Sequence, residues 1–210
     1  MGCDIHLYTE RRYKKDDKEI WICRDHFKRN SYSVLYPEEF YEKEWEIVSI
    51  YDHRDYNLFA ALADVRNYDH VIPIDKPRGL PEDVSKDVYS ESLRWGSDGH
   101  SHSWLTAREL FIYQRRHPTK RREGMLNPDD VKKLDEEGII PTSWCQWTNV
   151  KGAEKRVWIE PGSSVDKLVE AVKKRMSEEF WIFDFLNNDE KEKKFSEHAD
   201  DFRIVFWFDN

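Results

Sequence analysis

The chain of 210 residues has little cysteine and no long apolar run, and both absences narrow its class. Its three cysteines, Cys3, Cys23 and Cys145, are odd in number and widely spaced, so they predict neither a disulfide framework nor a CxxC zinc site. No apolar stretch approaches a membrane span, and the opening Met-Gly-Cys-Asp is not typical of a signal peptide. We therefore expect a cytoplasmic protein with no membrane partner.

Positive charge is also scarce relative to negative charge, and the formal net charge is -8. This balance disfavours broad binding to nucleic acid or to an anionic membrane. The one basic segment, 115–122, contains arginine and lysine without any acid, but no RNP, KH or helix-turn-helix signature accompanies it. We interpret it as the solvated end of a helix, where cations are favourable. Nucleic acid is therefore an unfavoured partner.

Aromatic residues are abundant, with nine Trp, ten Tyr and eleven Phe, and they indicate a folded chain despite a mean hydropathy of -0.89. Residues 3–10 alternate between an apolar and a polar face, and 19–23 are typical of a return strand. Residues 202–209, which are apolar on both faces, give the strongest strand signal. We predict an α+β fold, in which helices pack on an antiparallel sheet that contains the N- and C-terminal strands. A single domain over 1–210 is expected, with insertions at 24–50 and 111–160.

Spacing and capping residues locate the other elements. Apolar residues at helical intervals, with suitable caps, predict helices over 56–65, 84–93, 106–115, 127–138 and 163–176. Two strands, 143–148 and 156–160, are predicted to pair across a turn at Lys151-Gly152. The charge-rich segment 187–201 is predicted to be a solvent-facing loop.

The stretch from Trp95 to Trp104 carries the densest chemistry in the chain. His100 and His102 are two positions apart, which in an extended segment turns both imidazoles to the same side, and Asp98 joins them. Thr106 and Glu109 then have capping-box spacing, so a helix begins directly afterwards. Free N–H groups at such a helix start favour a phosphate or a carboxylate. Histidine and serine are also ordinary loop residues, and this stretch alone leaves both interpretations open.

Asp4 and His6 lie on one face of the first predicted strand, and they complete the set that we expect to be catalytic: Asp4, His6, His100 and His102. Two kinds of site are compatible with these residues. In the first, these four residues and Asp98 bind a divalent transition metal such as Zn, Mn or Fe, which activates water. In the second, no metal is present and histidines act as general acid and base while Arg66 or Arg78 neutralises a phosphate.

Substrate binding is assigned to polar and aromatic residues around this set. Arg78 precedes Gly79 in a proline-rich loop, which restrains it in a way that suits recognition of a planar anion. A structural ion pair is the alternative for each arginine, and core packing is the alternative for each tryptophan. The residues that we expect to bind substrate are Arg54, Arg66, Asn67, Arg78, Asp98, Ser101 and Trp104.

Four ordered motifs and the last strand resemble a family of small, mostly uncharacterised proteins from phages and bacterial genomes. The motifs are Met-Gly-Cys-Asp-Ile-His at 1–6, the segment 54–67 with Arg-Asp-Tyr-Asn-Leu-Phe-Ala, Pro-Arg-Gly-Leu-Pro-Glu-Asp at 77–83, and the stretch 95–110. The resemblance covers most of the first 110 residues and the final strand. It implies an association with phage proteins that counter nucleotide-based immune signalling, by cleaving a cyclic nucleotide or by sequestering it. The site of action would then be the host cytoplasm.

Together these observations predict a phosphodiesterase-type hydrolase that acts on a small nucleotide. The first alternative is a sponge protein that sequesters the same nucleotide without catalysis. The second alternative is an accessory protein that binds nucleic acid through the segment 115–122. The sequence leaves the oligomeric state open, with a homo-oligomer as one option.

Overall fold

The computed structural model describes residues 2–35 and 44–210, and the chain folds into two compact units. Unit 1 consists of Met1–Arg54, Pro77–Phe111 and Lys167–Asn210, and unit 2 consists of Asp55–Lys76 and Ile112–Asp166. Each unit is thus built from segments that lie far apart in the sequence. Part of the insertion expected at 24–50, namely 36–43, lies outside the described residues.

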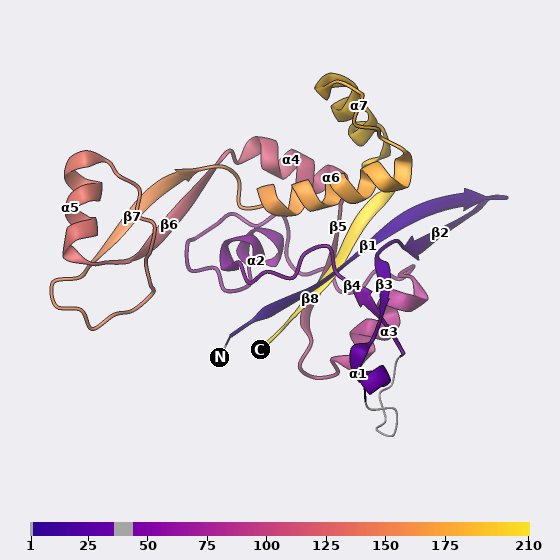
Figure 1. Cartoon of the computed structure of the whole chain (residues 1–210), viewed down its shortest axis with the longest axis horizontal. Helices are drawn as coiled ribbons and strands as arrows, with labels where there is room; N and C mark the ends of the chain where they lie inside the picture. The colour runs from indigo at the N-terminus through magenta and orange to yellow at the C-terminus, as the bar shows by residue number, and fades with distance from the viewer. Residues whose placement is uncertain (1, 36–43) are drawn as a thin grey trace. The chain divides into compact units, whose positions relative to one another are not determined.

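Unit 1 is organised around an antiparallel sheet in the order β2-β1-β8-β5 (Figure 1). Its strands are β1 (Asp4–Lys15), β2 (Lys18–Cys23), β5 (His100–Thr106) and β8 (Phe202–Asp209). β8 lies between β1 and β5, and all of its residues except Asp209 are buried. The N- and C-terminal strands are therefore neighbours in one antiparallel sheet, and the predicted α+β class is confirmed.

The two faces of this sheet are covered by different elements. One face packs against α6 (Asp166–Phe180), where Phe180 lies 6.2 Å from Phe202 and Arg11 of β1 donates to the backbone carbonyl of Glu179. On the other face, Tyr8, Val205 and Trp207 form an apolar cluster with Val88 of α3 (Lys86–Arg94). The second face holds the candidate site, so the position of α3 matters for function.

A buried ion pair fixes the start of α3 to the centre of the sheet. Glu10 of β1 is 0% exposed and Arg203 of β8 is 2% exposed. The Arg203 Nε donates to Glu10 Oε2 over 2.7 Å, and the backbone N–H of Ser85, the N-cap of α3, donates to Glu10 Oε1 over 2.7 Å. Arg203 also donates to Asp83 over 2.7 Å. The first turn of α3 is therefore tied to the sheet by charged hydrogen bonds.

Short elements complete unit 1. A two-stranded sheet pairs β3 (His26–Arg29) with β4 (Trp45–Val48), and α1 (Ser31–Leu35) follows β3. The segment 187–201, predicted to be a loop, forms α7 (Asn188–His198). The prediction is wrong because Asn187 and Glu190 make a reciprocal capping box, and because Phe195 is buried 6.4 Å from Phe111. One buried aromatic residue is enough to anchor a helix whose remaining residues are mostly polar.

Unit 2 contains α2 (Tyr56–Ala63), α5 (Pro128–Glu137), β6 (Thr119–Leu126) and β7 (Glu154–Pro161). The sequence predicts Asp52 or Asp55 as the cap of α2 and Asn127 as the cap of α5, and the caps in the structure are Asp55 and Asn127. The predicted pairing of 143–148 with 156–160 is wrong, since β7 pairs with β6 and only Cys145 of that segment forms a bridge. α4 (Ala107–Arg116) ends just before Pro118, which disfavours a helical conformation of the preceding residue. The residues that follow form β6, the partner strand of β7.

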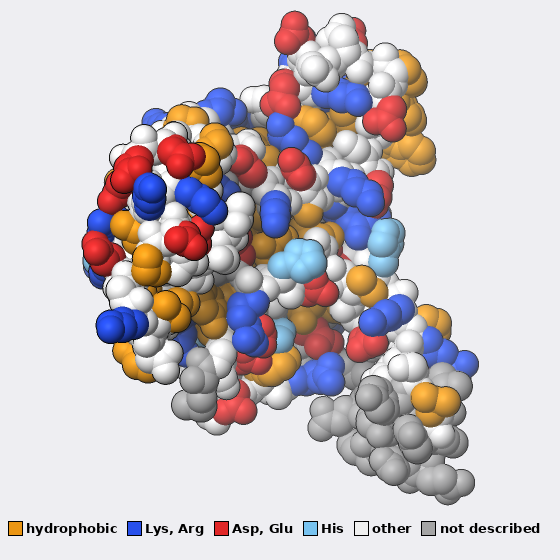
Figure 2. Space-filling view, turned by 60° about the vertical axis from the view of Figure 1, so that its left-hand side comes forward, with side chains coloured by type: hydrophobic (Ala, Val, Ile, Leu, Met, Phe, Trp, Pro, Cys, Tyr) orange, Lys and Arg blue, Asp and Glu red, His pale blue; other side chains and the backbone are white. Residues whose placement is uncertain are grey.

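Charge is spread over the molecule. In the face shown in Figure 2, lysine and arginine side chains alternate with aspartate and glutamate side chains. This mixture agrees with the many ion pairs between neighbouring elements, such as those of Arg12 with Asp201 and of Arg108 with Asp200. No basic tract dominates this view.

Asp25 is a buried carboxyl group of unit 1 that accepts two hydrogen bonds from Thr9 of β1. The Thr9 backbone N–H donates to Asp25 Oδ2 over 2.7 Å, and the Thr9 hydroxyl donates to Oδ1 over 2.6 Å. Burial disfavours the charged form and outweighs these hydrogen bonds, so the pKa of Asp25 is raised from 3.8 to about 6. Asp25 is therefore a site where pH acts on stability.

We predict that Asp25→Asn becomes more stable relative to the wild type as pH rises. Because the folded state raises this pKa, the stability that Asp25 contributes is full below the unfolded pKa of 3.8 and is lost as pH rises through about 6. The difference in unfolding free energy between the two proteins should therefore grow by about 3 kcal/mol from acid to neutral pH. Urea unfolding of both proteins across that range measures it. A difference that does not change with pH would contradict the assignment.

Candidate active site

The two histidines of β5 lie on opposite faces of the sheet. His100 pairs with Phe208 and Ser103 pairs with Phe206, so β5 uses one more residue than β8 between these pairs. The extra residue is accommodated by a β-bulge in which Ser101 adopts a φ of 53°. The prediction that His100 and His102 share a side is therefore wrong, because strict alternation fails at a bulge.

The surroundings of the two imidazoles differ accordingly. His100 stacks on Phe208 at 6.1 Å, and its Nδ1 lies 3.0 Å from Ser101 Oγ. Its Nε2 is buried and has no hydrogen-bond partner among the residues that the structure describes. His102 stacks on Trp207 at 5.4 Å. Burial, with a smaller contribution from His100, lowers the pKa of His102. His102, and not His100, lies on the face of the sheet that carries His6.

His6 is a titratable group on this face that is held by several neighbours. Its ring lies 3.8 Å from that of Trp95 and 6.0 Å from that of its cross-strand partner Trp207. Its Nε2 lies 3.3 Å from Asp209 Oδ2. A carboxylate only accepts hydrogen bonds, so Nε2 carries the hydrogen and Nδ1 keeps a lone pair. Burial lowers the pKa of His6, and the imidazole is therefore neutral and basic at neutral pH.

Asp4 is not available as a second catalytic group, because it forms an ion pair with Arg54. Arg54 donates to both Asp4 carboxylate oxygens, over 2.8 Å from Nε and 2.6 Å from Nη2, and this contact lowers the pKa of Asp4. A side chain at Gly2 would come within 2.6 Å of the Arg54 guanidinium. The Asp4 backbone N–H donates to Asp209 Oδ1 over 3.0 Å. The Asp4 backbone thus helps to hold the carboxylate that contacts His6.

A pocket of about 370 Å³ opens beside this group. Trp95 both lines the pocket and contacts His6, and Tyr8 lines it two residues further along the same face of β1. From α3 come the buried Glu91 and the more exposed Arg94, whose Nη1 donates to Glu91 Oε2 over 3.1 Å. The described residues that line the pocket are Tyr8, Glu46, Ile47, Glu91, Arg94 and Trp95.

The predicted substrate-binding residues of unit 1 are not among the described residues that line this pocket. Arg78 is held by Glu109, over 2.5 Å at Oε1, and lies 5.0 Å over the Trp104 ring. Asp98 lies in the exposed turn before β5, and Ser101 contacts His100. Arg78 and Trp104 thus have the structural roles that the alternative interpretation gave them, as an ion-pair partner and a packing residue.

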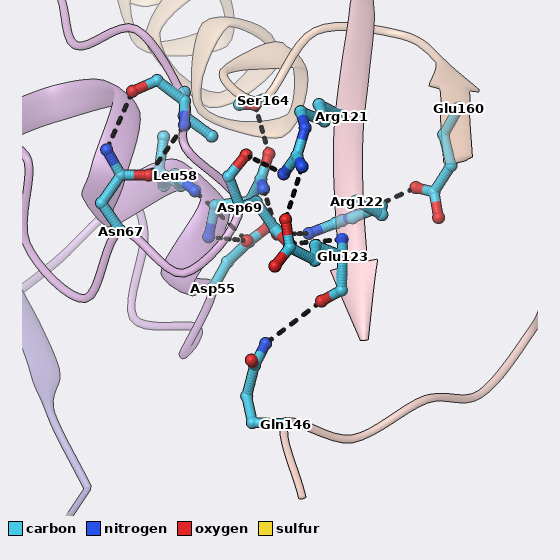
Figure 3. Close-up of polar contacts among 12 residues, drawn as sticks. Asp55, Leu58, Asn67, Asp69, Arg121, Arg122, Glu123, Gln146, Glu160 and Ser164 are labelled. Carbon is cyan, nitrogen blue, oxygen red and sulfur yellow. Dashed lines mark hydrogen bonds and ion pairs between the residues drawn. The ribbon is translucent and has the colours of Figure 1, made fainter. Parts of the chain in front are cut away.

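Arg66 and Asn67 belong to unit 2, where a polar network surrounds Asp69 (Figure 3). Asn67 bonds the backbone of Val71 from both ends of its amide, and Arg66 adopts a φ of 51° in the same loop. The Asp69 carboxylate accepts from the side chain of Asn57 over 2.6 Å and from the backbone N–H of Glu123 over 2.8 Å. The loop is therefore fastened to β6 by internal hydrogen bonds.

The same network accounts for part of the basic segment 115–122. Arg121 forms an ion pair with Glu123, and Arg122 forms ion pairs with Asp69 and Glu160. Arg115 and Arg116 occupy the last turn of α4, as expected for cations at a helix end. Arg121 and Arg122 of the basic segment are thus paired with acids of the protein itself. We do not propose a nucleic-acid role for the segment.

The metal hypothesis receives no geometric support among the described residues. Within 2–35 and 44–210, no three side chains of His, Cys, Asp or Glu converge as metal ligands would. His100 faces away from His6 and His102, and Asp4 is bound to Arg54. We therefore derive no step through a metal, and elemental analysis of the purified protein remains its test.

Comparisons with known protein families, with curated proteins and with solved structures gave no match. No described helix is both long and apolar enough to cross a membrane.

The sequence did not reveal three residues of the candidate site. Asp209 is the polar last residue of an apolar strand, and the sequence pattern alone gives it no role in the site. Antiparallel pairing of the two terminal strands places it opposite Asp4. Glu91 and Arg94 resemble ordinary surface residues of a helix when only the sequence is considered. Their spacing of three residues is the available signal, because it places both side chains on one helix face.

Proposed function

We propose that the protein hydrolyses a phosphodiester bond in a small nucleotide that binds in the pocket beside Trp95. The observation that carries this proposal is the contact of His6 Nε2 with Asp209 at the margin of that pocket. A neutral imidazole that is oriented by a carboxylate is the usual arrangement of a general base.

The chemistry assigns one role to each group. The water oxygen attacks phosphorus while His6 Nδ1 accepts its proton, and Asp209 stabilises the imidazolium that forms. The P–O bond to the ribose oxygen breaks, the leaving oxygen takes up a proton from solvent, and the imidazolium returns its proton to solvent. General base catalysis of this kind contributes typically about 10²–10⁴-fold to a rate. Tyr8 and Trp95 offer aromatic surface to a base, and Arg94 is a cation among the lining residues that can hold a phosphate. The substrate class that we favour is a cyclic nucleotide, the class implied by the resemblance to phage proteins that counter immune signalling.

A second candidate is sequestration of the same nucleotide without turnover. The separation of His100 and His102 by the β-bulge favours it, since no paired histidines of β5 face His6 as general acid and base. Trp95 also contacts both the pocket and His6, so its indole separates part of the pocket from the imidazole. Both candidates require nucleotide binding, and they differ only in what is released.

Incubation with a panel of cyclic nucleotides, followed by chromatography before and after heat denaturation, separates the two. We expect hydrolysed product in solution before denaturation. Recovery of intact nucleotide only after denaturation would select sequestration. Intact nucleotide in solution throughout, with none retained by the protein, would contradict both candidates.

A further inference from the structure

We infer that the hydroxyl group of Tyr8 donates a hydrogen bond to the phosphate of the nucleotide that binds in the pocket beside Trp95. This inference rests on the proposed binding of a nucleotide, and it names a residue that holds the phosphate. It does not depend on whether the bound nucleotide is hydrolysed.

Tyr8 carries a polar group for which the described protein supplies no partner. The residue is 7% exposed, and its ring stacks on that of Trp207 at 5.1 Å. Within the part of the chain that the structure describes, its hydroxyl group makes no hydrogen bond. A buried hydroxyl group without a partner costs free energy that a phenylalanine of the same shape would not cost. Packing alone therefore does not account for a tyrosine at this position.

Tyr113 of unit 2 shows the ordinary arrangement of a buried tyrosine. It is 6% exposed, and its ring stacks on that of His117 at 4.1 Å. Its hydroxyl group donates to the backbone carbonyl of Ile72 over 2.8 Å. The two tyrosines are thus alike in burial and in stacking. They differ in that Tyr113 has a hydrogen-bond partner within the protein, whereas Tyr8 lines a pocket from which a ligand can supply one.

The neighbours of Tyr8 favour an anionic oxygen as that partner. Burial, followed by the charge of Glu91, raises the pKa of Tyr8, so the hydroxyl group keeps its proton and acts as a donor. Arg94 lines the same pocket and uses Nη1 to donate to Glu91, and its other nitrogens make no hydrogen bond to a described residue. Hydrogen bonds to a charged acceptor are the stronger ones, and donors from Tyr8 and Arg94 suit two oxygens of one phosphate.

The position of Tyr8 on β1 agrees with the role proposed for His6. The two residues are two positions apart and share a face of the strand, and both rings stack on Trp207, at 5.1 Å for Tyr8 and 6.0 Å for His6. A phosphate held by Tyr8 is therefore on the face of the sheet that carries the proposed general base. The aromatic surface of Trp95 remains for the base of the nucleotide.

The test is calorimetry of 3′,5′-cyclic GMP and 3′,5′-cyclic AMP, each compared with its nucleoside, on the wild-type protein and on Tyr8→Phe. Guanosine and adenosine keep the base and the ribose but lack the phosphate. We expect Tyr8→Phe to bind the cyclic nucleotides about ten- to hundredfold more weakly, the usual effect of a hydrogen bond to a charged group, and to bind the nucleosides as the wild type does. Equal affinities of the two proteins for the cyclic nucleotides would overturn the inference. An equal weakening for nucleotide and nucleoside would also overturn it, because the hydroxyl group would then contact the nucleoside.

Urea unfolding of the same proteins tests whether the hydroxyl group is structural. Tyr8→Phe should keep the wild-type midpoint, because no hydrogen bond within the described protein is lost. The matched control is Tyr113→Phe, which removes the hydrogen bond to Ile72 and should lower the midpoint while leaving the affinity for the cyclic nucleotides unchanged. A lower midpoint or a loss of folding in Tyr8→Phe would show that this hydroxyl group holds the fold, and would overturn the assignment.

Chromatography of the mixtures with cyclic nucleotide keeps this inference distinct from the proposed hydrolysis. Weaker binding by Tyr8→Phe, without product from either protein, would support the phosphate contact and overturn hydrolysis. Equal binding by the two proteins, with product from both, would do the reverse. No binding of either cyclic nucleotide to the wild-type protein would overturn both.

Discussion

Replacing Arg203 by methionine lowers the free energy of unfolding by about 3–5 kcal/mol, because it leaves the carboxylate of Glu10 buried without its charged partner. Glu10 is 0% exposed, and Arg203 reaches it over 2.7 Å from the neighbouring strand β8. Urea unfolding followed by tryptophan fluorescence measures the loss. The effect also reaches the site, since Glu10 holds the N-cap residue of α3 over 2.7 Å.

A matched control distinguishes burial from mere loss of a charge. Arg12→Met removes the ion pair with Asp201, and the Arg12 side chain in that pair is 24% exposed. Because the pair is open to solvent, the substitution should lower the free energy of unfolding by less than about 1 kcal/mol. Adding Glu10→Gln to Arg203→Met removes the orphaned charge and should restore part of the stability, since the glutamine oxygen can still accept from Ser85. Equal losses in Arg12→Met and Arg203→Met would contradict this interpretation of the sheet.

Replacing His6 by glutamine lowers kcat for nucleotide hydrolysis by about 10²–10⁴-fold, the usual contribution of a general base. Glutamine retains a donor for Asp209 but has no group that accepts a proton from water. Steady-state kinetics with the nucleotide that is hydrolysed most rapidly measures the loss, and thermal unfolding shows whether the fold is retained. Asp209→Asn should also lower kcat, because the asparagine no longer stabilises the imidazolium.

The pH dependence and a second histidine provide the controls. The wild-type rate should rise with pH through the pKa of His6, which burial holds below its ordinary value of 6.5. His102→Gln, on the same face but across Trp207, should cost much less than His6→Gln. A larger loss in His102→Gln would move the base to the other side of Trp207 and contradict our assignment.

The strands of the sheet could be predicted from the sequence because strand patterns are local. Residues 202–209 include five apolar residues in succession, from Ile204 to Phe208, and the structure buries all of the strand except Asp209 at the centre of the sheet, with β1 as neighbour. The caps Asp55, Asn127 and the pair Thr106 and Glu109 were predictable for the same reason. Each depends on residues within one turn of the chain.

The candidate site could be predicted only in part, because its geometry depends on contacts that are distant in sequence. The bulge at Ser101 can be located only when the register of β5 against β8 is known. A register shift of one residue moves every later side chain of the strand to the other face of the sheet. The contact of His6 with Asp209 joins the two ends of the chain. The pocket requires α3 to lie over β1, and the buried contacts of Glu10 decide that placement.

The most direct test of the central claim is a crystal structure of the protein with a phosphorothioate analogue of cyclic GMP that resists hydrolysis. We predict that the base lies against Trp95, and that the phosphorothioate lies within hydrogen-bond reach of Arg94 and His6 Nδ1. A nucleotide bound elsewhere, with the pocket beside Trp95 empty, would contradict the claim.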